Sequence, residues 1–268
     1  MIIKTLSGYI KAVNSFRKRI EPSKTILYRG QAKSKWPIVS SLERSGLSDM
    51  TFREYYSLID FFKPEINSYG RRFERKYKFP NGYEFNFSDF NSVSFDQFPE
   101  MNYIAYLRHH GFPSPLVDFS KSEYIALFFA CEDAVNVNRK LSNGKVYVLQ
   151  SGLWEVKGAD LNEIHEIGHY VETDQRHIVQ QSEYLVGCRY DSYRKEWLFI
   201  PFSSCIGCSK NESESQFLEL EIAASAKVDL LHELNKMNIN HYTLYRDEDS
   251  LIKKLQFDFF QNCKRMII

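Results

Sequence analysis

The 268-residue sequence has little excess charge of either sign and few cysteines. It contains 35 Lys and Arg against 34 Asp and Glu, which leaves a net charge of +1. Binding to nucleic acid through the whole surface requires many uncompensated cations, so the composition excludes that class and leaves open only a local basic patch. The five cysteines include one CxxC pair, Cys205 and Cys208, with no second pair at zinc spacing. We therefore expect no metal site.

Long apolar runs, leader patterns and repeats are also missing. No stretch approaches the roughly 20 apolar residues that a membrane-spanning helix needs, and the first residues lack the pattern of a signal peptide. We therefore expect a cytoplasmic protein without a membrane partner. Hydrophobic residues make up 43% of the chain and aromatic residues 15%, which argues against disorder and predicts a large core.

The order of expected elements predicts one α+β domain over residues 1–268, with a mostly antiparallel sheet and flanking helices. A helical insertion is expected at roughly 45–110, with a helix over 51–69 and another over 100–110. Asp160–His169 is expected to form a short helix. The remaining expected helices cover 3–19 (capped by Ser7), 123–135, 227–238 and 247–260, and the expected strands cover 25–28, 116–119, 145–150, 184–186, 197–201 and 217–222.

The stretch from Pro113 to Cys131 carries the densest local signal. A short apolar run containing Asp118 leads through Ser120 and Ser122 into a helix that is apolar on nearly all sides, so this helix should be central and buried. Serine and aspartate are ordinary helix caps, because their oxygens accept hydrogen bonds from the free N–H groups of the first turn. The same groups could instead face a phosphate or a ribose. Both interpretations remain open at this point.

Arg29, Gly30 and Gln31 follow the first apolar strand directly. Arginine is rarely buried without an anionic partner, so Arg29 either pairs with an internal carboxylate such as Asp118 or holds a carboxylate or phosphate of a ligand. Gly30 permits a tight turn or the close approach of a ligand. His109 precedes the serine-rich turn by about a dozen residues and is expected to lie beside the same ligand.

Two further stretches are rich in polar residues. The segment that contains Arg71, Arg72, Arg75 and Lys76 is basic with interleaved aromatic residues. It is either a solvated helix face or a contact for nucleic acid, where cations hold phosphates and aromatic rings stack on bases. Gln180, Gln181, Ser182 and Glu183 precede an apolar strand, and this run indicates either a bulge or a site.

The order and spacing of several motifs resembles the FRG domain family of bacterial and phage proteins. The motifs are Tyr28-Arg-Gly-Gln31, Trp36, Ser40–Arg44, His109-x-Gly111, Pro113, Leu116–Ser120 and Ala126–Ala130, followed by Gln180, the strand near Phe217, Lys227 and Leu244-Tyr-Arg-Asp247. The resemblance therefore covers most of the chain.

A looser likeness points to chemistry. Arg-Gly after a first strand, a Ser-x-Ser turn before a buried helix, and Gln-x-Glu entering a strand is similar to ADP-ribosyltransferases of the Arg–Ser–Glu type. The similarity implies an ADP-ribosyltransferase-like core and NAD as the cofactor. Arg29 would hold the NAD, Ser120 and Ser122 would shape the nicotinamide site, Gln181 would orient the acceptor, and Glu183 would stabilise an oxocarbenium-like state. Gly30, Gln31, His109, Asp118 and Gln180 complete the set of residues expected around the cofactor.

Three functions are consistent with these residues. The first is an NAD-dependent ADP-ribosyltransferase that modifies nucleic acid or protein in a toxin or phage-defence setting, with an antitoxin or defence-system partner. The second is a non-catalytic module that binds a nucleotide or nucleic acid through Arg29, the serine turn and the basic segment. The third is a hydrolase that uses His109, Asp118 and Glu183, for which the sequence has no recognisable metal-ligand spacing.

Overall fold

The computed structural model describes residues 1–70, 73, 100–135, 140–152, 160–168, 171–206 and 217–266. The strands in these ranges are β1 (Ile2–Ile3), β2 (Ile26–Gln31), β3 (Val117–Ser120), β4 (Gly144–Gln150), β5 (Glu163–Glu166), β6 (Ser182–Asp191), β7 (Glu196–Phe199) and β8 (Phe217–Ile222). The α-helices are α1 (Leu6–Arg17), α2 (Ser41–Arg44), α3 (Phe52–Ser68), α4 (Met101–His109), α5 (Glu123–Cys131), α6 (Gln175–Val179), α7 (Phe202–Ile206), α8 (Lys227–Lys236), α9 (His241–Tyr245) and α10 (Glu248–Met266). Two 3₁₀ turns, Glu132–Val135 and Ala224–Ala226, follow α5 and precede α8.

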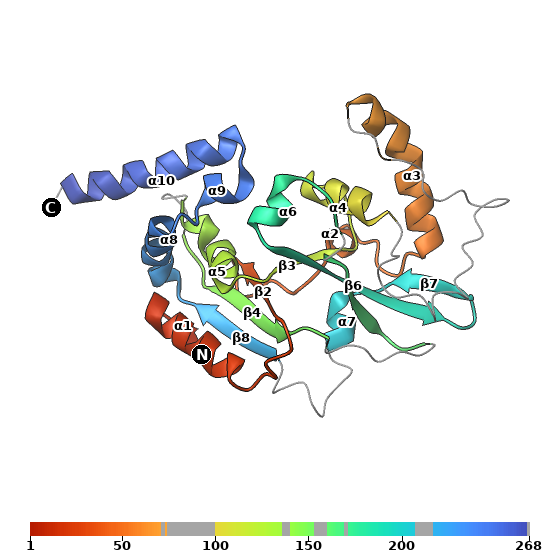
Figure 1. Cartoon of the computed structure of the whole chain (residues 1–268), viewed down its shortest axis with the longest axis horizontal. Helices are drawn as coiled ribbons and strands as arrows, with labels where there is room; N and C mark the ends of the chain where they lie inside the picture. Colours follow the sequence, from red (N-terminus) through yellow and green to blue (C-terminus); the bar gives the residue numbers. More distant parts are fainter. Residues whose placement is uncertain are drawn as a thin grey trace.

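The strands form one sheet in the order β1-β8-β4-β2-β3-β6-β5, and β7 pairs with β6. Neighbouring strands are antiparallel apart from β1 and β8, which run parallel. The predicted fold class, an α+β single domain with a mostly antiparallel sheet and flanking helices, is confirmed (Figure 1). In the part of the chain that the structure describes, no helix is long and apolar enough to cross a membrane.

The sheet is nearly divided between β2 and β3. On its other side β2 pairs with β4 along its whole length, from Ile26 to Gln31. Toward β3 it forms a single pair, Tyr28 with Ser120, although β3 pairs with β6 over all four of its residues. Two continuous half-sheets thus meet at one point, and beyond Tyr28 the edges of β2 and β3 face each other without a ladder. A gap of this kind gives side chains and ligands access to strand edges that a complete sheet would close.

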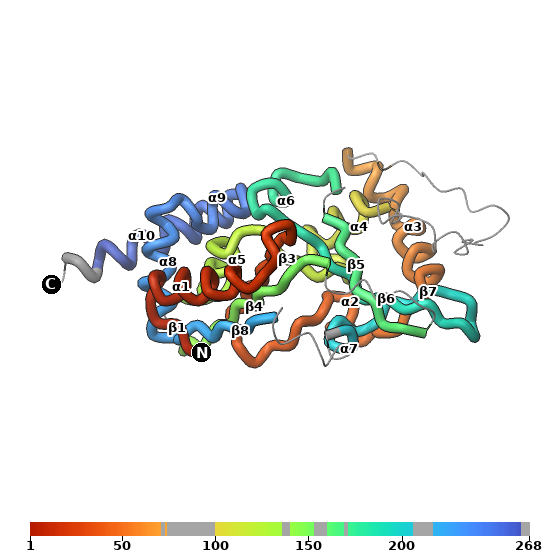
Figure 2. The backbone as a smooth tube through the Cα atoms, turned by 60° about the horizontal axis from the view of Figure 1, so that its bottom comes forward, coloured from red at the N-terminus to blue at the C-terminus, as the bar shows by residue number. Residues whose placement is uncertain are grey.

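Helix α5 packs against the β2–β4–β8 half of the sheet and is the centre of its core. Ile125, Leu127 and Phe128 are almost fully buried there, together with residues from α1 and α8, and Figure 2 shows these three helices gathered beside β4. Ser122 caps the helix by accepting a hydrogen bond from the Ile125 N–H, as the sequence predicts. The expected central, buried helix is confirmed, but it ends at Cys131, and residues 132–135 form a 3₁₀ turn.

Gly30 is explained by this packing. A β-carbon at Gly30 would lie 1.8 Å from the carbonyl oxygen of Ala126, inside helix α5. Because that atom belongs to the backbone, it cannot move aside as a side chain could. The glycine therefore lets α5 lie directly on β2, which fixes the position of the helix end relative to the strand.

A second, aromatic-rich core covers β6 and β7. Helices α3 and α4 pack there, and Phe52 stacks on Phe199 with ring centroids 4.1 Å apart. Both helices were predicted, within the insertion between β2 and β3. Helix α4 ends at His109, and Gly111 adopts a positive φ of 82° just beyond it, as expected for a glycine after a helix C-terminus. The end of α4 is thereby directed toward the start of β3.

Two local predictions are wrong. Asp160–His169 contains strand β5 rather than a helix, because Glu163 to Glu166 pair with β6 in an antiparallel ladder. Non-local pairing of this kind overrides local preference. The first helix is capped by Thr5, whose hydroxyl accepts from the Gly8 N–H, rather than by Ser7.

Candidate functional site

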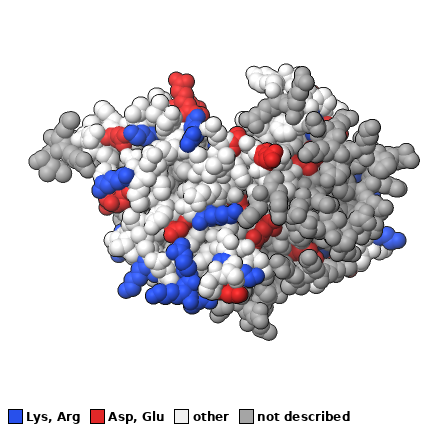
Figure 3. Space-filling view, viewed as in Figure 1, with Lys and Arg blue, Asp and Glu red and all other residues white. Residues whose placement is uncertain are grey.

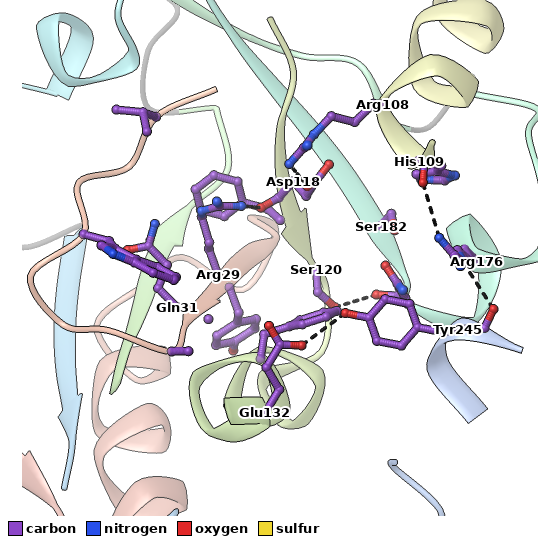
Figure 4. Close-up of a pocket in the computed structure, with 18 of the residues that line it drawn as sticks. Arg29, Gln31, Arg108, His109, Asp118, Ser120, Glu132, Arg176, Ser182 and Tyr245 are labelled. Atoms are coloured by element: carbon purple, nitrogen blue, oxygen red, sulfur yellow. Dashed lines mark hydrogen bonds and ion pairs between the residues drawn. The ribbon is translucent and has the colours of Figure 1, made fainter. Parts of the chain in front are cut away.

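A cavity of about 660 Å³ lies where β2 and β3 separate. Figure 4 shows the side chains that converge on it from β2, β3, α4, α6 and the segment after α5. Its lining residues are Tyr28, Arg29, Gly30, Gln31, Ala32, Trp36, Pro37, Val39, Arg44, Arg108, His109, Asp118, Phe119, Ser120, Phe129, Glu132, Arg176, Gln180, Ser182 and Tyr245. The volume falls within the range of about 300–1,000 Å³ that is usual for small-molecule sites.

Seven of the ten residues predicted for the site line this cavity. They are Arg29, Gly30, Gln31, His109, Asp118, Ser120 and Gln180. Residues more than 150 positions apart in the sequence, Arg29 and Gln180, thus meet in one place. The remaining three, Ser122, Gln181 and Glu183, do not line it.

One end of the cavity is cationic; we call it the arginine end and define it by Arg29, Arg44, Arg108 and Asp118. Arg108 donates from Nη2 to Asp118 Oδ2 at 2.6 Å, and Arg29 donates from Nη1 to the backbone oxygen of Asp118 at 2.5 Å. The Arg29 side chain therefore bridges the gap between β2 and β3. Three guanidinium groups face one lining carboxylate here, so positive charge is in surplus.

Burial and like charge act together on the arginine end. Burial lowers the pKa of Arg29 to about 10; the neighbouring Arg108 and Arg44 add to the lowering, and Asp118 opposes it. Burial by itself would raise the pKa of Asp118, but Arg108 and Arg29 outweigh it and lower that pKa below the ordinary carboxyl value. The like charges of the arginines repel one another, at a cost that an anion could relieve.

Several buried polar atoms at this end have no partner among the described residues. They are Nε of Arg29, Nε of Arg108 and Oδ1 of Asp118, and Oε1 of Gln31 is in the same state nearby. Buried polar groups are almost always hydrogen-bonded in native proteins, because an unmet bond costs about 1–3 kcal/mol. Two free N–H donors and two free acceptors indicate a polar ligand that can both accept and donate.

The other end of the cavity is defined by Glu132 and Tyr245, and we call it the carboxylate end. Glu132 follows the last residue of α5, and its Oε2 accepts a hydrogen bond of 3.1 Å from the Tyr245 hydroxyl. Figure 4 shows this pair on the far side of Ser120 from the Arg108–Asp118 ion pair. The charges that act on Glu132 are Asp133, Lys253 and Lys227 rather than the arginines of the cavity. The two ends are therefore electrostatically distinct.

Ser120 and Gln180 connect the two halves of the molecule between these ends. Ser120 Oγ donates to the Gln180 carbonyl at 2.8 Å and accepts from the Ser122 N–H at 3.0 Å. The Gln180 side chain donates from Nε2 to the Leu244 carbonyl at 3.0 Å. The Ser120 side chain thus holds the turn before α5 against the segment before β6, and the Gln180 side chain ties that segment to α9. Of the two sequence interpretations of this turn, capping accounts for the contacts of Ser122, whereas Ser120 also lines the cavity.

His109 is held from both sides. Its Nδ1 lies 3.0 Å from Asp174 Oδ1, and its Nε2 lies 2.9 Å from the hydroxyl of the fully buried Tyr184. Arg176 fixes the same corner, because it donates to the carbonyls of His109 and Tyr245 and to Asp247. Both ring nitrogens of His109 are engaged by protein groups, so the imidazole supports the wall of the cavity.

The catalytic role predicted for Glu183 is wrong in its geometry. Neighbouring residues of a strand point to opposite faces, and Ser182 rather than Glu183 faces the cavity. The Glu183 side chain has no exposed surface; it accepts from the Gly168 N–H and pairs with Lys121 Nζ at 3.2 Å. A carboxylate enclosed in this way cannot contact a ligand at Arg29. The hydrolase hypothesis also needs the Glu183 carboxylate beside the ligand, so it is wrong for the same reason.

Gln181 and Ser122 also lie outside the cavity. Gln181 is exposed, has a left-handed backbone with a φ of 47°, and accepts from the Lys121 N–H through its carbonyl. Gln180 and Gln181 thus form the turn that ends α6, and Ser182 and Glu183 are the first residues of β6. An acceptor-orienting role for Gln181 therefore has no geometric support.

The sequence interpretation overlooked Arg44, Arg108, Glu132, Arg176 and Tyr245. One signal could have indicated Glu132. A helix C-terminus carries partial negative charge and favours cations, yet Glu132 and Asp133 directly follow the last residue of the buried helix. Asp133 is balanced by Lys227 at 2.7 Å. Glu132 has no such partner among the described residues, and an acidic side chain in this unfavourable position calls for another explanation.

One face of the outer surface carries charges of both signs (Figure 3). On the face in Figure 3, acidic and basic residues are interspersed, with Lys and Arg gathered at the lower left. The predicted contact for nucleic acid, Arg71, Arg72, Arg75 and Lys76, lies outside the described residues. Within the described ranges, no group of three or more His, Cys, Asp and Glu could hold a metal ion; Cys208 lies outside them.

Comparison with known proteins supports part of the predicted resemblance. No curated protein and no solved structure matches the chain. The motifs from Gln180 onward lie beyond the region for which a family match exists. Residues 24–139, which supply β2, α4, β3 and α5 and with them both Arg29 and Glu132, match the model of the FRG domain.

Proposed function

We propose that the chain is an NAD-dependent ADP-ribosyltransferase that binds NAD in this cavity and modifies nucleic acid or protein. The observation that carries the proposal is the arginine end. A pyrophosphate offers several anionic oxygens, and the planar guanidinium group of arginine matches such oxygens with two parallel hydrogen bonds. Arg29, Arg44 and Arg108 provide surplus positive charge on the cavity wall, at the point where the sheet opens.

The polar side chains that line the cavity fit such a ligand. The guanidinium groups of Arg29 and Arg108 can donate to phosphate oxygens, and the Asp118 carboxylate and the Gln31 amide can accept from ribose hydroxyls. The ion pair to Arg108 holds the Asp118 carboxylate in place. Each of these groups is already positioned by the protein, so little further ordering is needed on binding.

Aromatic side chains can hold the base. Trp36 lines the cavity while half of its surface, 49%, is exposed, and the Nζ of Lys33 lies 5.2 Å from the centre of its ring. The backbone of Trp36 is anchored, because Tyr147 donates to its carbonyl. An exposed but anchored indole offers a surface on which an adenine or nicotinamide ring can stack.

NAD would supply the cleavable bond between ribose and nicotinamide, and the protein would supply position and charge. The arginine end binds phosphate and fixes the orientation of the ligand. The wall formed by His109, Arg176 and Gln180 is held by hydrogen bonds to neighbouring backbone, so it keeps its shape when the ligand enters. Preorganised groups of this kind lower the cost of reaching the transition state.

A second candidate is a non-catalytic nucleotide-binding module. It is favoured by one observation: the carboxylate that the resemblance assigns to catalysis, Glu183, is enclosed outside the cavity. The arginine end would then recognise a nucleotide without cleaving it.

Release of nicotinamide from NAD separates the two functions. Purified protein would be incubated with NAD alone, and then with total cellular RNA, DNA or protein as acceptor. Release that requires one acceptor class, and that falls at least tenfold in Arg29→Ala, is expected from the transferase. Arg53→Gln is the matched control, because Arg53 forms a partly exposed ion pair with Glu196 away from the cavity. NAD binding without release in any mixture would identify the binding module.

A further inference from the structure

Glu132 is a carboxylate of the cavity that the sequence motifs do not assign to any role. It begins the 3₁₀ turn after α5, lines the cavity, and is partly buried. Tyr245 donates to its Oε2, and Oε1 has no hydrogen-bond partner among the described residues. Tyr245 is in turn held by Arg176, whose guanidinium lies 5.2 Å from the centre of the Tyr245 ring. One oxygen is thus fixed by the protein and the other is available to a ligand.

The surroundings of Glu132 keep its proton affinity high. Burial is the largest cause that raises its pKa to about 7, and Asp133 adds to it. The hydrogen bond from Tyr245 and the positive charges of Lys253 and Lys227 act in the opposite direction. Lys227 is fully buried, but it is bound to Asp133 and to the Ala32 carbonyl. The carboxyl can therefore gain and lose a proton near neutral pH.

The other acidic groups near the site are less suited to proton transfer. Asp118 is held in an ion pair with Arg108, and the lowering of its pKa keeps it anionic. Glu183 is enclosed on the other side of the strand. Asp133 is occupied by Lys227 and does not line the cavity.

We propose that Glu132, positioned by Tyr245, is the catalytic base of the cavity and faces the sugar of a nucleotide whose phosphates lie at the arginine end. This inference rests on the proposed function. The positive charge of Arg29, Arg44 and Arg108 fixes the place of the phosphates, and the proposal puts the ribose next to nicotinamide, rather than the ribose of adenosine, at the carboxylate end. Ser120 lies between the two ends (Figure 4).

The step balances with the acceptor as the second reactant. The bond between ribose C1′ and the nicotinamide nitrogen breaks, and its electron pair leaves with nicotinamide. A bond forms between C1′ and the oxygen or nitrogen of the acceptor, and the proton of that O–H or N–H group passes to Glu132. The carboxylate also opposes the positive charge that develops on the ribose. Neither oxidation nor reduction occurs.

The test compares Glu132→Gln, Tyr245→Phe and the control Glu183→Gln with the wild-type protein. Calorimetry measures NAD affinity, and nicotinamide release measures turnover with the acceptor class that supports it. Glu132→Gln should bind NAD within about threefold of wild type but lose at least 100-fold in turnover, the usual contribution of a general base. Glu183→Gln should keep wild-type turnover per folded molecule, since this side chain lies outside the cavity.

Two readouts follow the proton itself. The turnover of the wild type should fall as the pH drops below about 7, and Tyr245→Phe should move that fall to higher pH, because the lost hydrogen bond lowered the pKa. Infrared spectroscopy should detect a protonated carboxyl band that titrates near pH 7 in the wild type and is missing from Glu132→Gln. The infrared measurement does not depend on turnover.

The outcomes distinguish the two proposals. If Glu132→Gln turns over within threefold of wild type, Glu132 is not the base, whereas NAD-dependent transfer remains. If the infrared band persists in Glu132→Gln, another carboxyl titrates near pH 7 and the assignment to Glu132 is overturned. If the wild-type protein binds NAD but releases no nicotinamide with any acceptor, the proposed function fails and the role of Glu132 fails with it.

Discussion

The two ends of the cavity differ in charge, in origin and in how the protein holds them. The arginine end comes from β2, α2, α4 and β3; Arg29 is held by a contact across the gap in the sheet, and Arg108 by its ion pair with Asp118. The carboxylate end comes from the segments that follow α5 and form α9, and a single hydrogen bond joins its two residues. If the proposed function holds, ligand binding and chemistry lie on separate parts of one fold, and each part can be tested by its own experiment.

The largest effect is expected from the contact between β2, which carries Arg29, and α5, which directly precedes Glu132. Gly30→Ala would place a β-carbon inside the backbone of α5, 1.8 Å from the Ala126 carbonyl. Overpacking of this kind costs about 3 kcal/mol or more, which lowers the melting temperature by roughly 6–12 °C. Thermal unfolding followed by circular dichroism measures it.

Gly8→Ala is the matched control for that substitution. Gly8 lies in helix α1, where an added β-carbon meets only the Thr5 hydroxyl at 3.1 Å, and alanine is the better helix former. Its melting temperature should equal or exceed that of the wild type. A Gly30→Ala protein as stable as the wild type would contradict the role that we assign to the α5–β2 contact.

Arg108→Gln removes one guanidinium group from the arginine end and leaves the residues of the carboxylate end unchanged. Loss of a charge-assisted hydrogen bond costs about 1.5–3 kcal/mol, so NAD affinity should fall at least tenfold by calorimetry. Nicotinamide riboside, which lacks phosphate, should bind the variant and the wild type alike. An equal loss of affinity for both ligands would show that Arg108 acts through the fold rather than through phosphate.

Glu132→Gln tests the carboxylate end through the pH dependence of the free energy of unfolding. The folded protein keeps until about pH 7 the proton that an ordinary glutamate releases near pH 4.5, so the stability of the wild type should fall as the pH rises between these values. The free energy of unfolding of the variant should not fall in this way. At pH 8 the variant should therefore be more stable than the wild type by on the order of 2 kcal/mol, a value that allows for the partial exposure of the side chain. At pH 4 the two proteins should agree. Urea unfolding at both pH values measures the difference, and Glu21→Gln, at an exposed position, should show none.

The smallest effect on ligand affinity is expected from Trp36, which lines the cavity and is half exposed. Trp36→Ala should weaken NAD binding about fivefold, which corresponds to about 1 kcal/mol of lost stacking, with little change in stability because 49% of the side chain is exposed. Tyr193→Ala, at a position that is 95% exposed and away from the cavity, is the control. Equal affinity in wild type and Trp36→Ala would remove Trp36 from the site.

Much of the fold could be predicted from local pattern. The apolar run of α5 and the serine at its start indicated a buried, capped helix. An arginine at the end of an apolar strand indicated an anionic partner; Arg29 bonds the backbone oxygen of Asp118, whose carboxylate acts on it as a nearby charge. Both signals are local, because each depends only on residues that are close to one another in the sequence. Strand β5 could not be predicted in this way, since Glu163 to Glu166 become a strand only by pairing with β6.

The face of a strand residue was the harder problem. Ser182 and Glu183 differ by one position, yet one lines the cavity and the other is enclosed. A shift of one residue exchanges the two faces of a strand, and the sequence does not state which face looks toward Arg29. Glu132 could not be assigned either, because its neighbour Tyr245 is 113 residues away. Such pairs form only when the chain is folded.

A crystal structure with a carbocyclic NAD analogue, whose bond to nicotinamide cannot be cleaved, tests the central claim most directly. We expect the pyrophosphate within hydrogen-bonding distance of Arg29 and Arg108, and the ring that replaces the nicotinamide ribose facing Glu132. An analogue bound in the opposite orientation, or outside the gap between β2 and β3, would contradict it.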